Sequence, residues 1–235
     1  MGEMLKAIQN RQSARGAYDI HRPVDMEDLK QILEAGRWAP TAHNMQNFEI
    51  IVVNDKSLLK EIGDIESPIS QTFIRENYRQ LAFSEEELQR KKIGILGTMF
   101  PEYMRNPKIK PRPDEKTSSF QGRLVKTSPV ILVVVYDPGK RAPASWGDFL
   151  GIMSLGCVME NMWLMAHSLG INCHILSSFS NGTVENKVKG ILGIPKNLKI
   201  AFTCRLGYPA VPAHPLRVRR DVEDFTSYNR FGNKL

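Results

Sequence analysis

The stretch FLGIMSLGCVMENMWLMAHSL, residues 149–169, is apolar on nearly every face of a helix. Its length raises the question of a membrane span, but Glu160, Asn161 and His167 lie inside it. A span of the bilayer needs about 20 consecutive apolar residues, and soluble proteins bury helices that are apolar all round at their centres. We therefore expect a core helix and no membrane partner.

Strands are predicted on both sides of this helix. The apolar run 130–136 precedes it, and the runs 171–176 and 200–206 follow it. Continuous, β-branched runs of this length are typical of buried strands. A helix near residues 184–192 separates the last two strands, and Gly207-Tyr208-Pro209 ends the second of them.

Farther towards the N-terminus, helices alternate with one more strand. Asp25 precedes apolar residues at helical spacing, which predicts an amphipathic helix over residues 26–37. The run 48–53 indicates a strand, and residues 57–62 a short helix. A short apolar helix is also expected at residues 4–8.

The middle of the chain combines a predicted helix with an irregular segment. Ser84 and Glu87 form the pattern of a capping box at the start of an expected helix over residues 84–100. Four prolines mixed with charges then predict an irregular surface insert at about 101–119, a candidate lid.

The alternation of strands and helices by itself suggests an open parallel α/β sheet. No strand is followed by G-x-G-x-x-G or by G-x-x-x-x-G-K-[ST], so neither common nucleotide-binding motif is supported. A chain of 235 residues needs no second domain, and we expect one domain over residues 1–235.

Composition narrows the class of protein further. The net charge is +7 and the pI about 9.3, but the cations are scattered and no nucleic-acid-binding pattern accompanies them, so we expect no nucleic-acid partner. Cys157, Cys173 and Cys204 lie in apolar runs, which favours reduced thiols and a cytoplasmic setting. The N-terminus lacks the pattern of a secretory signal. We expect no metal, because the histidines show no ligand spacing: His21, His43, His167, His174 and His214.

Three polar clusters are candidates for chemistry. Residues 11–15 read Arg-Gln-Ser-Ala-Arg, whose guanidinium groups could hold a phosphate, although a solvated helix end is the ordinary interpretation. Residues 39–48 read APTAHNMQNF and could hydrogen-bond a heterocycle or simply join a helix to a strand. Residues 217–220 place three cations in the tail, a feature usually found on surfaces.

Taken together, these clusters resemble the nitroreductase family. The family's Arg-x-Ser-x-Arg/Lys signature matches residues 11–15, and its Ala-Pro-Ser-x-x-Asn-x-Gln-Pro-Trp-like segment matches residues 39–48. Asn161 in the core helix and the basic tail at 217–225 fall in the family's order. The chain departs from the family at Asn47-Phe48, where Pro-Trp is usual, and in its long charged insert.

The resemblance implies an α+β fold with a mixed, mainly antiparallel sheet flanked by helices, in an intertwined homodimer. It replaces the parallel sheet suggested by the alternation of elements. It also implies an FMN cofactor, with NADH or NADPH as co-substrate. Arg123 would lie near the flavin N1 and C2 carbonyl, where a cation meets charge that develops on reduction.

The residues that the resemblance assigns to FMN fall into three groups. The phosphate, the ribityl chain and part of the ring would be held by Arg11, Gln12, Ser13, Arg15, Arg217 and Arg219. The flavin of the other subunit would be reached by Pro40, Thr41, Ala42 and Asn44. The ring or its N5 would be touched by Ser154, Ile175, Ser177 and Ser178.

The activity implied is a two-step electron transfer. Reduced nicotinamide would pass hydride to the flavin and leave, and a small acceptor such as a nitroaromatic or quinone would follow, in a ping-pong order. No side chain is expected to be an indispensable acid or base. Alternatives are a non-catalytic flavin carrier or sensor, a dehalogenase-like or flavin-fragmenting member of the same fold, and, more distantly, a basic nucleic-acid-binding protein.

Overall fold

The computed structural model describes residues 2–66, 76, 80–99, 102, 106, 108–110, 120–211 and 216–234. The chain divides into two compact units, the first formed by 1–67 and 114–213 and the second by 68–113 and 214–235. This division does not test whether residues 1–235 form one domain, so the expected single domain stays a prediction. The irregular insert expected at 101–119 lies almost entirely outside the described residues.

The first unit contains a four-stranded sheet in the order β1-β4-β6-β5. Its strands are β1 (Glu49–Val53), β4 (Val130–Tyr136), β6 (Lys199–Gly207) and β5 (Asn172–Ile175), and every neighbouring pair is antiparallel. The parallel sheet suggested by alternating elements is thus wrong, and the mainly antiparallel sheet implied by the resemblance is confirmed. Apolar runs mark strands buried on both faces, but they carry no information on strand direction.

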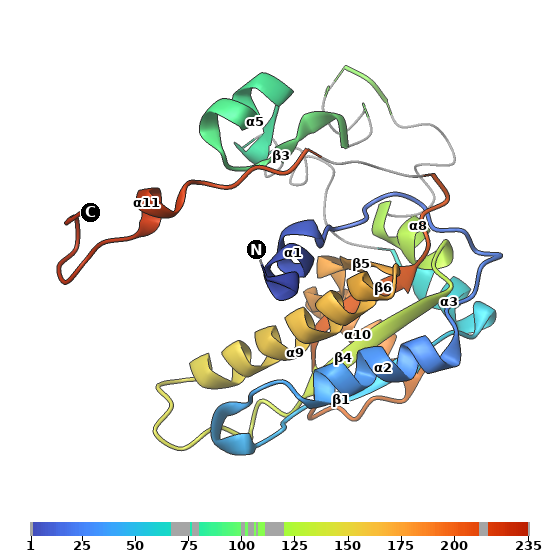
Figure 1. Cartoon of the computed structure of the whole chain (residues 1–235). Helices are drawn as coiled ribbons and strands as arrows, with labels where there is room; N and C mark the ends of the chain where they lie inside the picture. The colour runs from blue at the N-terminus through green and yellow to red at the C-terminus, as the bar shows by residue number, and fades with distance from the viewer. Residues whose placement is uncertain are drawn as a thin grey trace. The chain divides into compact units, whose positions relative to one another are not determined.

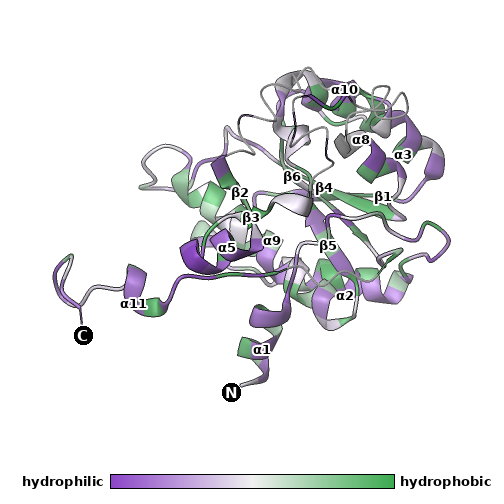
Figure 2. Ribbon diagram, turned by 90° about the horizontal axis from the view of Figure 1, so that it is seen from above, coloured by the Kyte–Doolittle hydropathy of each residue, from purple (hydrophilic) through white to green (hydrophobic). Residues whose placement is uncertain are grey.

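Helices cover both faces of this sheet (Figures 1 and 2). One face carries α2 (Met26–Arg37) and α9 (Phe149–Ser168), and the other carries α3 (Lys56–Gly63), α8 (Phe120–Lys126) and α10 (Gly182–Leu192). The predicted helices at 26–37, 57–62, 149–169 and 184–192 are confirmed to within a few residues.

The central strand β4 supplies both cores. Leu132 and Val134 belong to the core beneath α2 and α9, whereas Ile131, Val133 and Val135 belong to the core beneath α3 and α10. This division follows from the alternation of side chains along a strand. Because β4 contributes side chains to the cores on both faces of the sheet, every position of the strand has to be apolar.

The core helix α9 is buried along one stripe only. Its buried residues are Leu155, Val158, Met162, Trp163 and Ala166. Phe149, Ile152 and Met153, in its first turns, are more than half exposed. Length and composition would let α9 cross a membrane, but core helices of soluble proteins pass the same test, and α9 packs against α2 and the sheet. The expected core helix is thus confirmed, although its first turns are exposed.

In the second unit, the helix predicted over residues 84–100 is shorter than expected. Helix α5 (Glu85–Lys91) starts with the predicted Ser84–Glu87 capping box. It ends because Lys92 adopts a left-handed conformation, with φ 54°. The chain continues as β3 (Ile95–Leu96), parallel to β2 (Ala82–Phe83), and then as η2 (Gly97–Met99). The tail, expected to be irregular, contains the short helix α11 (Val222–Phe225).

Candidate functional site

The segment after α1 (Glu3–Asn10) runs beside the edge strand β5. Ser13 forms a parallel bridge with Cys173, and the Ala14 amide donates to the Cys173 carbonyl at 3.3 Å. The segment Arg11–Gly16 is therefore fixed by the backbone of the sheet. A solvated helix end would need no such support.

Arg11 lies against α9. Its Nε is 3.1 Å from an oxygen of Glu160, and its guanidinium lies over the Trp163 ring, 4.4 Å from the centroid. The Trp163 indole N–H donates to the Gln12 carbonyl at 3.2 Å. The helix thus holds the first two residues of the segment and partly balances the charge of Arg11.

Arg205, which sequence reasoning did not select, holds the other end of the segment. It is 0% exposed. Its Nη1 donates to the Leu124 carbonyl at 3.1 Å, and its Nη2 donates to the carbonyls of Ala14, at 3.1 Å, and Gly16. The guanidinium stacks on the Tyr18 ring, 3.9 Å from the centroid. A charged residue inside the apolar run 200–206 was the signal that could have identified it.

His174 faces Arg205 across the β5–β6 pair. Burial, followed by the positive charges of Arg205 and Arg15, lowers the pKa of His174 to about 3. The imidazole is therefore neutral at physiological pH, and its Nδ1 is buried without a hydrogen-bond partner. Burial is the main cause of the lowered pKa of His174, and the positive charges of Arg205 and Arg15 add to it.

The contacts of Arg205 join two predicted parts of the site. Leu124 follows Arg123 in α8, while Ala14 and Gly16 flank Arg15. Strand β5 ends nearby, at Ile175, and η3 (Ser177–Ser180) follows it. We call this group the arginine end. Its residues are Arg11–Gly16, Arg123, Ile175, Ser177, Ser178 and Arg205.

The remaining predicted residues of the first unit form a second group. The Ala42 amide donates to Ser154 Oγ at 2.9 Å, and this hydroxyl donates to the Leu150 carbonyl at 2.7 Å. Ser154 therefore fastens η1 (Ala42–Asn44) to α9. We call residues 39–48 with Ser154 the amide end.

The tip of the amide end is exposed and has an unusual backbone. His43, Asn44 and Gln46 have φ angles of 52°, 52° and 46°, in the left-handed region that L-residues seldom adopt. The Gln46 side chain donates to Asn44 Oδ1 at 3.1 Å. Such strain persists only where the surroundings enforce it and gathers at functional sites.

Asn47, where the family usually has proline, holds the turn after β4. Its Nδ2 donates to the carbonyls of Asp137 and Lys140 at 2.9 and 3.1 Å, and the Asp137 amide donates to its Oδ1 at 3.1 Å. A proline side chain could make none of these bonds. The departure from the family pattern therefore has a structural role in this chain.

The two ends do not converge within one chain. Ser154 contacts the amide end and Trp163 contacts the arginine end, nine residues later on α9. At 1.5 Å per residue, they are about 13 Å apart along the helix axis. The family resemblance assigns the amide end to the flavin of another copy, and this assignment stays a prediction.

Arg217 and Arg219 belong to the second unit. Near them in the tail, Asp221 forms an ion pair with Lys92, which follows α5. The tail is thus tied to the segment that follows α5. The assignment of both arginines to the phosphate stays a prediction.

The arginine end fits an anionic cofactor such as FMN. Arg205 pairs with no carboxylate among the residues that the structure describes, and its Nε is buried without a hydrogen-bond partner. Arg15 adds to the positive field that acts on His174. A phosphate and a ring that gains negative charge on reduction would both be stabilised there.

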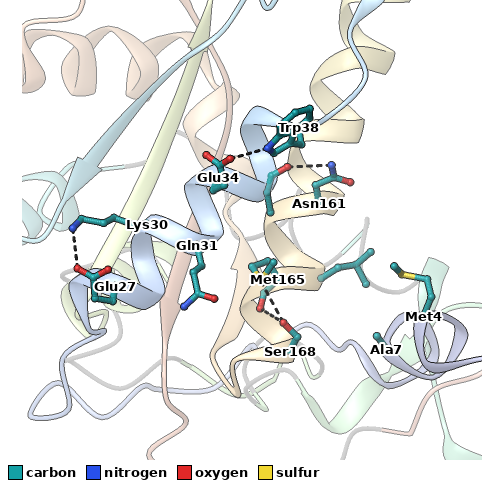
Figure 3. Close-up of a pocket in the computed structure, with 12 residues that line it drawn as sticks. Met4, Ala7, Glu27, Lys30, Gln31, Glu34, Trp38, Asn161, Met165 and Ser168 are labelled. Atoms are coloured by element: carbon teal, nitrogen blue, oxygen red, sulfur yellow. Dashed lines mark hydrogen bonds and ion pairs between the residues drawn. The ribbon is translucent and has the colours of Figure 1, made fainter.

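A groove of about 850 Å³ lies among α1, α2 and α9 (Figure 3). Trp38 lines it and donates from its indole N–H to Glu34 at 2.7 Å. Asn161, which the family resemblance singled out, donates to the Ala35 carbonyl at 3.1 Å and so joins α9 to α2. Met4 and Met165 add apolar surface to the groove.

Comparisons with known proteins identify the family of this chain. A profile of the nitroreductase family matches residues 8–208. An Archaeoglobus fulgidus protein provisionally named NADH dehydrogenase/NAD(P)H nitroreductase is 25% identical over 211 residues, covering 89% of this chain and 87% of that protein. The FMN reductase [NAD(P)H] of Bacillus subtilis is 37% identical over 65 residues, 28% of this chain and 25% of that protein.

Solved structures share the fold. A nitroreductase from Bacteroides fragilis, crystallised with bound FMN, has a TM-score of 0.59 and 22% identity. The match covers 96% of this chain and 98% of that chain.

Proposed function

Because this chain belongs to the nitroreductase family, we propose that it is an FMN-dependent oxidoreductase. It takes electrons from NADH or NADPH and passes them to a small acceptor such as a nitroaromatic or quinone. The observation that carries the proposal is the arginine end, where the buried Arg205 has no anionic partner among the described residues. The names of the relatives support the same chemistry.

Each part of the arginine end has a role in binding. Arg11 and Arg15, with Arg217 and Arg219 from the tail, hold the phosphate through charge-assisted hydrogen bonds. Arg123 places its charge near the flavin N1 and C2 carbonyl. FMN, when bound, supplies the hydride chemistry itself, so the protein has to provide alignment and electrostatics.

No side chain of the arginine end acts as an acid or base in this proposal. His174 is neutral and largely buried, with a pKa of about 3, so it has no proton to donate near pH 7. Replacing His43, His167 or His174 should change turnover much less than the roughly hundredfold or greater loss expected for a general acid or base. Initial-rate plots should show the parallel lines of a ping-pong order.

The active form is a homodimer in the cytoplasm. Trp146, Phe149, Ile152 and Met153 are 53 to 95% exposed, which leaves an apolar surface at the start of α9. Large exposed apolar surfaces mark interaction sites. The amide end of one chain would then complete the arginine end of its partner. The buried free thiols of Cys173 and Cys204 support a reducing compartment.

A mixed dimer tests the sharing of sites. One chain carries Arg11→Ala and Arg219→Ala, and the other carries Asn44→Ala. With shared sites, the second chain's arginines and the first chain's Asn44 form one intact site, so about half of the wild-type activity should remain. If each chain built its own site, both sites would be damaged and the mixed dimer would be as weak as the parent variants.

The visible spectrum of the purified protein tests the activity. We expect a flavin spectrum that bleaches on anaerobic addition of NADH or NADPH and returns when a quinone is added. A flavin spectrum that persists with both nucleotides would indicate a carrier or sensor. A protein that binds no flavin would overturn the proposal.

A further inference from the structure

Arg205 has an unusual environment for a cation. It lies on β6 with no exposed surface, and its hydrogen bonds all go to neutral groups. Its nearest aromatic partner, Tyr18, is a phenol whose pKa is raised above its usual value, chiefly by burial. No carboxylate within the described ranges forms an ion pair with it.

Carbonyl partners satisfy donors without cancelling charge. A buried charge is costly unless it is paired, and a guanidinium does not lose its proton in proteins. Three carbonyl dipoles and a ring face offset part of that cost. The remaining positive charge acts on neighbouring groups: burial is the main cause of the lowered pKa of His174, and the charge of Arg205 adds to it.

The hydrogen bonds of Arg205 also join α8 to the Arg11–Gly16 segment. Its Nη2 donates to the carbonyls of Ala14 and Gly16, on either side of Arg15, and its Nη1 donates to the carbonyl of Leu124, next to Arg123. The rigid fork of a guanidinium can span these acceptors at once, whereas the single ammonium of lysine cannot.

We propose that Arg205 is a positioning residue of the flavin site, which sets the distance between Arg15 and Arg123 and raises the midpoint potential of bound FMN through its unpaired charge. The inference rests on the proposed function. The two effects are separable, because one depends on the geometry of the side chain and the other on its charge alone.

The experiment compares Arg205→Lys with Arg205→Gln in the full-length protein. FMN dissociation constants and midpoint potentials are measured by flavin fluorescence and by equilibration with redox dyes. Lys199→Gln is the control, because it removes a cation from the exposed start of the same strand.

Arg205→Lys should bind FMN about tenfold more weakly, because a lysine cannot hold the carbonyls beside Arg15 and Arg123 at once and both arginines are misplaced, while the midpoint potential should stay close to that of the wild type. Arg205→Gln should in addition weaken reduced FMN about tenfold more than oxidised FMN, by the Coulomb energy of one charge at intermediate range. For a two-electron couple, that lowers the midpoint potential by about 30 mV. Lys199→Gln should change neither quantity.

Equal potentials in Arg205→Gln and Lys199→Gln would overturn the electrostatic role, and an unchanged dissociation constant in Arg205→Lys would overturn the positioning role. If Arg205→Gln does not fold, the midpoint potential of FMN bound to Arg205→Lys tests the electrostatic role. The charge is kept in this variant, so a fall of about 30 mV or more would contradict a role for charge alone. A wild-type chain that binds no FMN overturns the proposed function and this inference together. If the wild type binds FMN and both Arg205 variants keep its dissociation constant and midpoint potential, only this inference is overturned.

Discussion

The two ends of α9 carry the two halves of the predicted site, and they are built in opposite ways. At the arginine end, Trp163 and Arg205 are buried and bond to the backbone of the segment 11–16. At the amide end, His43, Asn44 and Gln46 are in the left-handed region and are exposed. The first end is held by buried side chains, and the tip of the second lies on the surface.

From this difference we expect the arginine end and the amide end to contribute to FMN binding in different ways. The arginine end is organised in the isolated chain, because breaking its contacts would expose core residues or strand a buried cation. The tip of the amide end, at His43, Asn44 and Gln46, is exposed, and in the proposed dimer the partner would cover it. Mutations should therefore affect folding at the first end and only binding at the second.

The largest expected effect comes from Trp163→Ala. Trp163 is 9% exposed, stacks under Arg11 and bonds to Gln12. Loss of a buried aromatic side chain should lower the free energy of unfolding by about 3–5 kcal/mol, as measured by equilibrium denaturation in urea. Trp163→Phe, which keeps most of the volume, is the control and should lose far less. A loss below 1 kcal/mol in the alanine variant would show that the arginine end is not part of the core.

The next largest effect is expected from Arg219→Ala, which should weaken FMN binding and leave the free energy of unfolding unchanged. Removing one charge-assisted bond to the phosphate weakens FMN roughly tenfold or more, and Arg217→Ala should be weaker in effect. Arg230→Ala, in the same tail beyond α11, is the matched control and should leave affinity unchanged. Stoichiometric FMN with unaltered affinity in both variants would make the tail a solvated surface.

The pH dependence of stability tests the burial of His174. Its pKa of about 3 in the folded protein lies below the usual 6.5, so the unfolded chain takes up a proton that the folded chain refuses. The stability is complete above pH 6.5 and falls as the pH drops towards 3. Between pH 6.5 and 5 the loss is about 2 kcal/mol. His174→Asn should lose less over that interval in urea denaturation, and identical losses would contradict the buried, neutral imidazole.

The smallest expected effect is that of Gln46→Gly at the amide end. Glycine removes the cost of the left-handed conformation but adds backbone entropy to the unfolded chain, and both are about 1 kcal/mol. The free energy of unfolding should therefore stay within about 0.5 kcal/mol of the wild type. A larger loss would mean that this segment packs as firmly as the arginine end.

Local patterns were sufficient for the elements but not for every boundary. The helices at 26–37 and 149–169 follow from apolar spacing, because one stripe of each packs against the sheet. The helix expected over 84–100 ends at Lys91, since Lys92 turns left-handed and β3 pairs with β2. Strand pairing involves residues far along the chain, so no local pattern around Lys92 predicts it.

The residues of the amino-acid sequence by themselves determined the core elements and the family-like clusters at 11–15, 39–48 and 217–220. Only the tertiary structure decided that Arg205 holds the first cluster and that the first two clusters lie at opposite ends of α9. The physical reason is that burial and charge pairing depend on which strands and helices meet. In the sequence, Arg205 is marked only as a charge inside an apolar run, and its role follows from the carbonyls of Leu124, Ala14 and Gly16 that it binds.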